Sequence, residues 1–370
     1  MKIIRVETVP IRIPYTKGYK TSLSTKVVQA AVLVKIYTDE DLVGIGECAP
    51  YPSFSGDTQE TAKVVIDRYL APVILNEDPF SLERLSTKME STLPHHQFAK
   101  AAIDIALHDI VGKSLNVPVY KLLGGRCRDQ ILVSAGIGIG SPEEVREAAE
   151  HAVKEGYRTL KVKIGMGVNE DVETVRTIRN AVGDGIKIRV DANQAYNART
   201  AIKIIKKMEV YDLELVEQPV KGWDMEGLAR VAHSVDTPIA ADESVMTFNA
   251  ALEVIRRKAA DILCLKVAKL GGLTNVRKAA IIADAADMQC WVGTMMETGV
   301  GTSANIHFVA ATKNIEIASE GVRPPKHLLK DDVVSEYIKM RNGLVDVSSV
   351  DRPGLGVELD EEKVKKYSTE

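Results

Sequence analysis

The chain has 370 residues, of which 45% are hydrophobic and 27% are charged, and its formal net charge is −3. This composition is that of a globular protein rather than a disordered one, and the length suits a barrel of roughly 200–250 residues with a smaller second domain. The charge provides no basic stripe for a phosphate backbone, and aromatic residues make up only 5%, so we expect no nucleic-acid partner.

The sequence gives no sign of a targeting or membrane-spanning segment. Its start, MKIIRVETVPIRIP, lacks an apolar stretch followed by a small-residue cleavage site. No window approaches the ~18 apolar residues of a membrane span. The four cysteines, Cys48, Cys127, Cys264 and Cys290, are widely spaced without a metal-ligand pattern, so we interpret them as buried free thiols of a cytoplasmic protein.

The first part of the chain predicts an α+β domain, which we place at residues 1–125. Residues 2–13 and 28–37 alternate apolar with polar, as half-buried antiparallel strands do. Helical periodicity follows over residues 58–70 and again over residues 98–112. Strands followed by helices are typical of this class.

Further along the chain, a pattern of apolar strand, polar break and helix recurs eight times. The strand-like segments are ILVSAG (131–136), TLKVKIG (159–165), KIRVDAN (187–193), LELVEQP (213–219), PIAADES (238–244), ILCLKVAK (262–269), QCWVGTM (289–295) and NIEIAS (314–319). Near-continuous apolar runs indicate strands covered on both faces, as in a closed parallel barrel, which we place at residues 126–320.

An open doubly wound sheet is the alternative architecture, but no G-x-G-x-x-G follows the early strands, and eight similar units favour closure. Residues 321–370 contain no ninth unit, and we expect them to pack back on the first domain.

Charged residues interrupt the apolar strands near their C-terminal ends. They are Lys161 and Lys163 on the second strand, Asp191 on the third, Glu217 on the fourth, Asp242 on the fifth and Lys266 on the sixth. A charge inside a buried strand is costly unless it is compensated, and the C-terminal mouth is where barrel enzymes place their chemistry. Charges on five consecutive strands therefore predict an active site.

Three carboxylates of this set predict a metal site. Asp191, Glu217 and Asp242 are spaced 26 and then 25 residues apart, one in each βα unit. Converging carboxylates repel one another, and a hard divalent cation such as Mg²⁺ removes that conflict. The alternative is that the three carboxylates form separate salt bridges. Against it, Arg189 is the only arginine near the same depth along the strands. The neighbouring residues Asn193, Gln218 and Glu243 either support the ligands or are plain loop residues.

The lysines predict general bases. Lys161 and Lys163 are two residues apart, so a strand points both to one face, with Val162 and Ile164 on the other. Two ammonium groups near a dication should lose basicity, and a lysine with a pKa near ~7–8 is a competent base. Lys266 lies roughly across the barrel, which would put one base on each face of a bound substrate. A single lysine is usually a solvated surface residue, but three at the ends of buried strands favour catalysis.

At these residues the sequence resembles the enolase superfamily, in its muconate-lactonizing subgroup, near dipeptide epimerases, N-acyl amino acid racemases and muconate cycloisomerases. The motifs that carry the resemblance are L-K-V-K-I-G (160–165), V-D-A-N-Q (190–194), V-E-Q-P (216–219), A-D-E-S (241–244), L-K-V-A-K-L-G-G (265–272) and G-T-M-M-E (293–297). The resemblance implies a modified (β/α)7β TIM-type barrel under an N-terminal α+β capping domain, and a homo-oligomer, either a dimer or an octamer.

The same resemblance implies roles for the charged residues. Mg²⁺, with Mn²⁺ as a substitute, would bind Asp191, Glu217 and Asp242. Lys163 and Lys266 would be the acid/base catalysts, and Lys161 would assist electrostatically. Enolase-superfamily sites use a Lys or His base with one or two Mg²⁺ ions.

These residues specify abstraction of a proton alpha to a carboxylate, which gives an enolate, and they leave the overall reaction open. Return of a proton from the opposite face gives a racemase or epimerase of an amino-acid derivative (an N-acyl amino acid, a dipeptide or a proline-like compound), which is our leading prediction. The alternatives are a muconate-type cycloisomerase, and a lyase of the o-succinylbenzoate synthase or acid-sugar dehydratase type. A metal-stabilised scaffold barrel is the non-enzymatic alternative.

Substrate choice is expected from the eighth strand and from two capping loops, Tyr15–Lys26 and Pro50–Asp57, which are otherwise ordinary surface loops. The candidate substrate contacts are Glu297, Thr294, Ser319, Glu320, Tyr51 and Tyr19. Residues 317–323 lack the Asp-x-Asp pair of similar dipeptide epimerases and also the muconate cycloisomerase signature. Glu320 could bind an amine and Arg323 an anion, or both could be surface charges, and Glu297 could instead orient a lysine.

Overall fold

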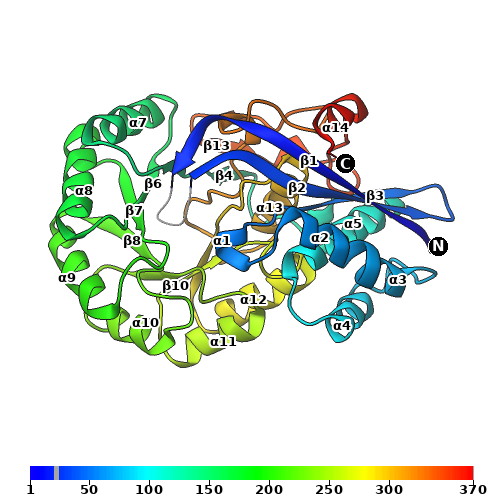
Figure 1. Cartoon of the computed structure of the whole chain (residues 1–370), viewed down its shortest axis with the longest axis horizontal. Helices are drawn as coiled ribbons and strands as arrows, with labels where there is room; N and C mark the ends of the chain where they lie inside the picture. Colours follow the sequence, from blue (N-terminus) through cyan, green and yellow to red (C-terminus); the bar gives the residue numbers. More distant parts are fainter. Residues whose placement is uncertain (21–24, 370) are drawn as a thin grey trace.

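The computed structural model describes residues 1–20 and 25–369 (Figure 1). It opens with an antiparallel sheet in the order β1 (Ile3–Lys20), β2 (Thr25–Thr38) and β3 (Val43–Cys48). The helices that follow are α1 (Pro52–Ser55), α2 (Gln59–Val65), the π-helical η1 (Ile66–Leu70), α3 (Ala71–Ile74), α4 (Leu82–Thr92), α5 (Gln97–Ser114) and α6 (Val119–Leu122). The predicted strands and helices of an α+β domain are confirmed.

Helix α5 packs against β3 at very short range, because glycines remove the side chains between them. A Cβ atom at Gly46 would lie 1.9 Å from the carbonyl oxygen of Ala102 in the helix, and one at Gly44 would lie 2.2 Å from that of Ala106. Residues 98–112 of the helix are buried on every side, so it is the centre of the first hydrophobic cluster.

The second part of the chain is a curved parallel sheet with helices on its outer side (Figure 1). Its seven strands pair in the order β11-β10-β9-β8-β7-β6-β5. They are β5 (Ala135–Ile137), β6 (Thr159–Lys163), β7 (Lys187–Asp191), β8 (Leu213–Glu217), β9 (Ile239–Ala241), β10 (Ile262–Leu265) and β11 (Gln289–Val292). The helices are α7 (Pro142–Lys154), α8 (Val168–Val182), α9 (Ala198–Met208), the 3₁₀ turn η2 (Glu209–Tyr211), α10 (Met225–Ala232), α11 (Phe248–Arg256), α12 (Leu273–Ala285) and α13 (Gly299–Ala310). The predicted barrel architecture with a capping domain is confirmed.

Two of the eight predicted strands differ from the prediction. The first, 131–136, divides into β4 (Gln130–Leu132) and β5, and β4 leaves the barrel to pair with β13 (Leu344–Asp346), next to β12 (Met340–Arg341).

The eighth predicted strand, residues 314–319, contains no assigned strand, and we call it the closing segment. It is held by the bonds from the Cys290 N–H to the Asn314 carbonyl (2.8 Å) and from the Ser319 N–H to the Leu132 carbonyl (2.9 Å), and by one bridge between Ser319 and Val133. A single bridge gives the closing segment no continuous strand neighbour on the β4 side within the described residues.

The two expected capping loops are largely regular structure. Residues 15–20 continue β1, and Thr25 and Lys26 begin β2, with Tyr19 paired to Lys26. The remaining residues of that loop, 21–24, lie outside the described residues. In the second loop, Pro52–Ser55 form α1. The loop prediction is therefore wrong at these positions, because the hairpin continues beyond the alternating pattern.

The first sheet is joined to the barrel by a buried carboxylate. Glu47 on β3 accepts hydrogen bonds from the Thr298 N–H (2.8 Å), the Thr298 hydroxyl (2.6 Å) and the Gly301 N–H (2.9 Å) at the start of α13. The exposed N–H groups of a helix N-terminus favour such an anion. Burial nevertheless raises the pKa of Glu47 to about 7, because the surroundings admit almost no water.

The C-terminal residues form η3 (Pro325–His327), β12, β13, η4 (Val347–Val350) and α14 (Glu361–Tyr367). They reach the first sheet, where Ser368 bridges to Ile11 and the Lys35 ammonium lies 2.7 Å from Glu361. The division into 1–125, 126–320 and 321–370 stays a prediction. Over the described part of the chain, no helix has the length and apolar character that crossing a membrane requires.

Candidate active site

The strand ends bring the six predicted charged side chains to one end of the curved sheet. Parallel pairing sets Lys163 beside Asp191, and Asp191 beside Glu217, at the last residues of their strands. Asp242 directly follows β9, and Lys266 directly follows β10. All six are buried, with the side chain of Lys163 the most exposed at 8%. The predicted convergence is therefore present.

Lys161 and Lys163 share one carboxylate. The Lys161 ammonium lies 2.9 Å from Oδ2 of Asp191, 2.7 Å from Oε2 of Glu217 and 3.3 Å from Oε2 of Glu320. The Lys163 ammonium lies 2.6 Å from the same Asp191 oxygen. Both lysines therefore point to the inner face, as the two-residue spacing predicts.

Asp242, directly after β9, is held by two lysines that follow the neighbouring strand β10. Lys266 donates to its Oδ2 (2.7 Å), and Lys269 donates to its Oδ1 and to its backbone carbonyl, both at 2.6 Å. Lys269 is fully buried and was not among the predicted site residues. The signal was available, because it closes the L-K-V-A-K motif, three residues after Lys266.

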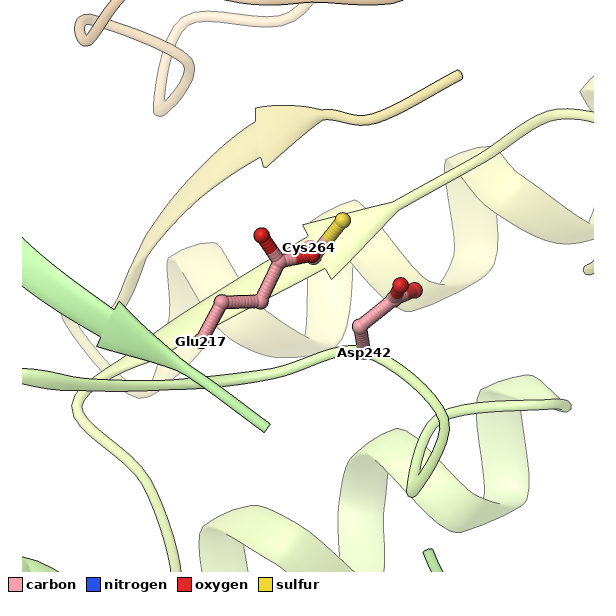
Figure 2. Close-up of side chains that lie close together, drawn as sticks. All are labelled: Glu217, Asp242 and Cys264. Carbon is pink, nitrogen blue, oxygen red and sulfur yellow. The ribbon is translucent and has the colours of Figure 1, made fainter. Parts of the chain in front are cut away.

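The donor atoms that could hold a metal ion form a compact group. One carboxylate oxygen each of Glu217 and Asp242 and the sulfur of Cys264 all lie within 4.8 Å of one another (Figure 2). Oε1 of Glu217 is buried and, over the described residues, has no hydrogen-bond partner. A buried carboxylate oxygen without a donor is costly, and a cation removes that cost. Asp191, the third predicted ligand, is outside this group and faces Lys161 and Lys163 instead.

The environments of the three carboxylates push their pKa values apart. Burial raises the pKa of Glu217 to about 8, and the negative charge of Asp191 acts in the same direction against Lys161. Burial also acts on Asp191 and Asp242, but the neighbouring ammonium groups outweigh it and hold both pKa values below their usual range. Burial and neighbouring carboxylates oppose ionisation of Glu217, and a divalent cation bound there would favour its charged form.

The predicted loss of lysine basicity depends on a neighbouring metal ion and stays a prediction, because the charged groups that contact the lysines here are carboxylates. Burial lowers the pKa of Lys163 and Lys266, but Asp191 raises that of Lys163 and Asp242 raises that of Lys266 by more. The pKa of Lys161 is raised well above its usual value for the same reason. The cause is direct contact: each ammonium group lies against a carboxylate rather than against a cation.

The predicted supporting residues contact this charged group. Asn193 accepts a hydrogen bond from Lys163 (2.9 Å) and donates to Oε1 of Glu243 (3.1 Å). Burial raises the pKa of Glu243 to about 7, with the Asp242 charge acting in the same direction. The side-chain oxygen of Gln218 accepts from the backbone N–H of Asp242 (2.9 Å) and so fixes that residue in place.

A partly enclosed cavity lies over the strand ends, and we call it the mouth cavity. It is lined by Tyr19, Lys26, Tyr51, Phe54, Lys161, Lys163, Asn193, Lys266, Thr294, Met295, Met296 and Glu320. Its roof comes from β1, β2 and the residues around α1, so the first domain covers the barrel mouth. The Lys26 ammonium lies 3.6 Å from the centre of the Tyr51 ring, and that of Lys266 lies 4.5 Å from the Phe54 ring.

Four of the six predicted substrate contacts, Tyr19, Tyr51, Thr294 and Glu320, line the mouth cavity. Ser319 does not, and its hydroxyl accepts a hydrogen bond from the Val292 N–H (3.1 Å).

Glu297 is also absent from the lining and accepts hydrogen bonds from the Thr294 hydroxyl (2.7 Å) and the Met295 N–H (2.9 Å). Glu320 and Arg323 are both buried and lie 3.9 Å apart, which excludes the surface-charge alternative.

Comparison with known proteins gives two family matches. Residues 3–124 match the model described as "Mandelate racemase / muconate lactonizing enzyme, N-terminal domain", and residues 144–363 match "Enolase C-terminal domain-like". The chain is 36% identical to the L-Ala-D/L-Glu epimerase of Bacillus subtilis (strain 168) over 360 residues, which are 96% of this chain and 97% of that protein. It is 35% identical to muconate cycloisomerase 1 of Rhodococcus opacus over 373 residues, which cover 100% of this chain and 99% of that one.

The fold is also similar to that of a solved structure over nearly the whole chain. The dipeptide epimerase of Enterococcus faecalis V583, complexed with Mg and the dipeptide L-Leu-L-Tyr, matches with a TM-score of 0.92 and 35% identity. The match covers 97% of this chain and 100% of that one.

Proposed function

The chain belongs to the enolase superfamily, in its muconate-lactonizing subgroup, and is an isomerase of that superfamily. From this membership we propose that it is a Mg²⁺-dependent racemase or epimerase of an amino-acid derivative. The observation that carries this proposal is the pair of lysines that line one cavity from separate parts of the sheet. Lys163 ends β6 and Lys266 follows β10, with three strands between them. Membership of the superfamily sets the scaffold-barrel alternative aside.

The metal supports this proposal through the residues that would hold it. Glu217 and Asp242 would bind Mg²⁺, and Asp191 would join them once its oxygen is released from the lysines. When bound, the ion supplies the positive charge that stabilises the enolate of a carboxylate substrate. The unpartnered, buried oxygen of Glu217 fits a hard cation, and Mn²⁺, which accepts the same oxygen ligands, is proposed as a substitute.

The lysines perform the proton transfers in this proposal. With Asp191 and Asp242 engaged as metal ligands, the lysines would lose the carboxylates that raise their pKa values. The neutral amine of one lysine then takes the α-proton, and the electron pair of the C–H bond moves into the substrate carboxylate. The ammonium group on the other side then donates its proton to the opposite face of the same carbon, which inverts it. Asn193 orients the Lys163 side chain through its hydrogen bond, and Lys161 contributes a second positive charge beside it.

The test is solvent exchange. Purified enzyme with Mg²⁺ is mixed with N-acyl amino acids and dipeptides in D₂O, and the α-proton signal is followed by NMR. We expect that signal to disappear as the opposite configuration accumulates. Turnover of muconate without exchange in any amino-acid derivative would contradict the proposal.

A muconate-type cycloisomerase is the second candidate, because Lys26 is placed to bind a second carboxylate on the substrate. This ammonium group lines the mouth cavity on the roof side, beyond the metal residues, and is suited to a second carboxylate on the substrate. Burial lowers its pKa to about 7, with Glu297 opposing and Lys266 assisting that effect. An epimerase whose substrate carries a distal carboxylate would use Lys26 in the same way, so the exchange experiment separates the two candidates.

A homo-oligomeric assembly, a dimer or an octamer, and a cytoplasmic location are also part of the proposal. Symmetric assemblies are the common state of soluble oligomers. Light scattering on the purified chain measures the first, and a molar mass equal to one chain of 40.4 kDa would contradict it. Fractionation of cells that express the protein tests the second.

A further inference from the structure

One ligand-type side chain in the barrel has no role in the proposed reaction. Cys264 lies on β10, two residues before Lys266, so both side chains point to the inner face of the sheet. It is fully buried and packs in a small interior cluster with Leu215, Ala240, Ile262 and Trp291. Its burial alone would be explained by packing, because a buried cysteine behaves as a small hydrophobic side chain.

A second observation connects this thiol to a ligand. Its sulfur and one oxygen each of Glu217 and Asp242 lie within 4.8 Å of one another, and Figure 2 shows the sulfur beside the Glu217 carboxyl group. Glu217 is fully buried, and its Oε1 has no hydrogen-bond partner within the described residues. The neighbouring strand leaves room for the sulfur, because a Cβ atom at Gly293 would lie only 2.7 Å from it.

We propose that Cys264, Glu217 and Asp242 form a second coordination mode for thiophilic divalent cations, such as Zn²⁺ and Cd²⁺, which compete with Mg²⁺ and inhibit the enzyme. Mg²⁺ binds oxygen ligands and has little affinity for a thiol, whereas Zn²⁺ and Cd²⁺ bind thiolate and carboxylate ligands together. Zn²⁺ with bonds of ~2.0–2.3 Å holds its donors roughly 3–4 Å apart, so the three side chains need to draw together only slightly.

Binding of the cation releases a proton and changes the partners of the neighbouring carboxylates. The cation replaces the proton of the Cys264 thiol, which passes to solvent, and one metal–sulfur bond forms without any redox change. The ion also takes an oxygen of Asp242, which Lys266 and Lys269 hold in its absence. Both Glu217 and Asp242 are then withdrawn from Mg²⁺. The inference therefore rests on the metal site of the proposed function, but not on its reaction.

The test uses Cd²⁺ and the whole purified protein, and its readout is the ultraviolet charge-transfer band of a cadmium–thiolate bond. We expect a band that saturates at one equivalent of Cd²⁺ and that Mg²⁺ shifts to higher Cd²⁺ concentrations. In Cys264→Ser the band should disappear and Cd²⁺ affinity should fall at least about tenfold. Cys290→Ser is the matched control, since Cys290 is also a buried thiol, on the adjacent strand β11, and should keep the band.

The inference is overturned if Cys264→Ser keeps the full band, or if Cys127→Ser, at the exposed thiol, loses it. Should Cys264→Ser not fold, Glu217→Gln, which leaves the thiol in place, is expected to weaken Cd²⁺ binding about tenfold while keeping a band at high Cd²⁺; unchanged affinity would overturn the inference. A Cys264-dependent band in a protein that exchanges no substrate proton would contradict the proposed function alone.

Discussion

Replacing Lys163 by Ala should separate the two proton transfers of the mouth cavity. If Lys163 and Lys266 serve opposite faces of the substrate, the substituted enzyme keeps one base. It should then still exchange the α-proton of the enantiomer whose C–H bond faces Lys266, and fail with the other enantiomer. Net racemization needs both lysines and should be lost in both directions.

The structure sets the size of this effect. A positioned general acid or base contributes about 10²–10⁴-fold, which is about 3–5 kcal/mol of transition-state stabilisation. The substitution also removes the 2.6 Å contact to Asp191 and the 2.9 Å bond to Asn193. Lys161 remains 2.9 Å from the same Asp191 oxygen, so we expect stability to fall by less than the roughly 3–5 kcal/mol of a fully broken buried pair.

The assay is ¹H NMR in D₂O with each enantiomer separately, beside a urea unfolding curve. Lys207→Ala, on the exposed face of α9, is the control and should behave as the unsubstituted enzyme. Lys266→Ala should show the opposite enantiomer preference. Equal loss of exchange for both enantiomers in a folded Lys163→Ala enzyme would refute the assignment of one lysine to each face.

Three further predictions follow from the site and its supports. Glu217→Gln should weaken Mg²⁺ binding at least about tenfold, measured by calorimetry, and equal affinity would remove Glu217 from the ligand set. With a substrate that carries a distal carboxylate, KM should rise as the pH passes upward through about 7, because Lys26 then loses its charge. Lys26→Met should raise KM about tenfold and abolish this pH dependence. The same pH profile in both enzymes would contradict the role of Lys26. Glu47→Ala should lower the free energy of unfolding by about 2–4 kcal/mol, because Thr298 loses its buried acceptor, whereas Glu40→Ala at the surface should change it little, and equal urea midpoints would contradict this.

The charged strand ends were predictable because few positions suit a charge inside a buried strand. Residues such as Asp191 and Glu217 interrupt runs that are otherwise apolar, and parallel pairing then sets them side by side. The period of the βα units gave the first residues of β6 to β10 to within one position, but the predicted segments run two to four residues beyond the observed strand ends. Where local pattern and tertiary structure agree, the sequence is sufficient.

What could not be predicted depends on contacts between distant segments. The closing segment has the alternation of a strand, yet it forms only one bridge to Val133 among the described residues, and the departure of β4 to pair with β13 is not indicated by the local sequence. Lys26 reaches the mouth cavity only because the first hairpin extends over the barrel. Cys264 fits an apolar strand equally well with or without a ligand, so its position beside Glu217 becomes visible only in three dimensions. The raised pKa of Lys163 likewise follows from its contact with Asp191.

The closing segment has a consequence for how such a protein changes over time. Its neighbours in the barrel are bound to one another along their length, so a substitution that shifts one of them displaces the proton-transfer groups as well. Residues 314–319 lack continuous strand pairing within the described part of the chain and are held by single bonds instead, such as those from the Arg189 guanidinium to the Ala318 carbonyl (2.7 Å) and from the Val292 N–H to the Ser319 hydroxyl (3.1 Å). Glu320 directly after them lines the mouth cavity. We therefore expect new side chains at the less buried positions of this segment, Glu316 and Ile317, to leave the paired strands and their proton-transfer groups in place.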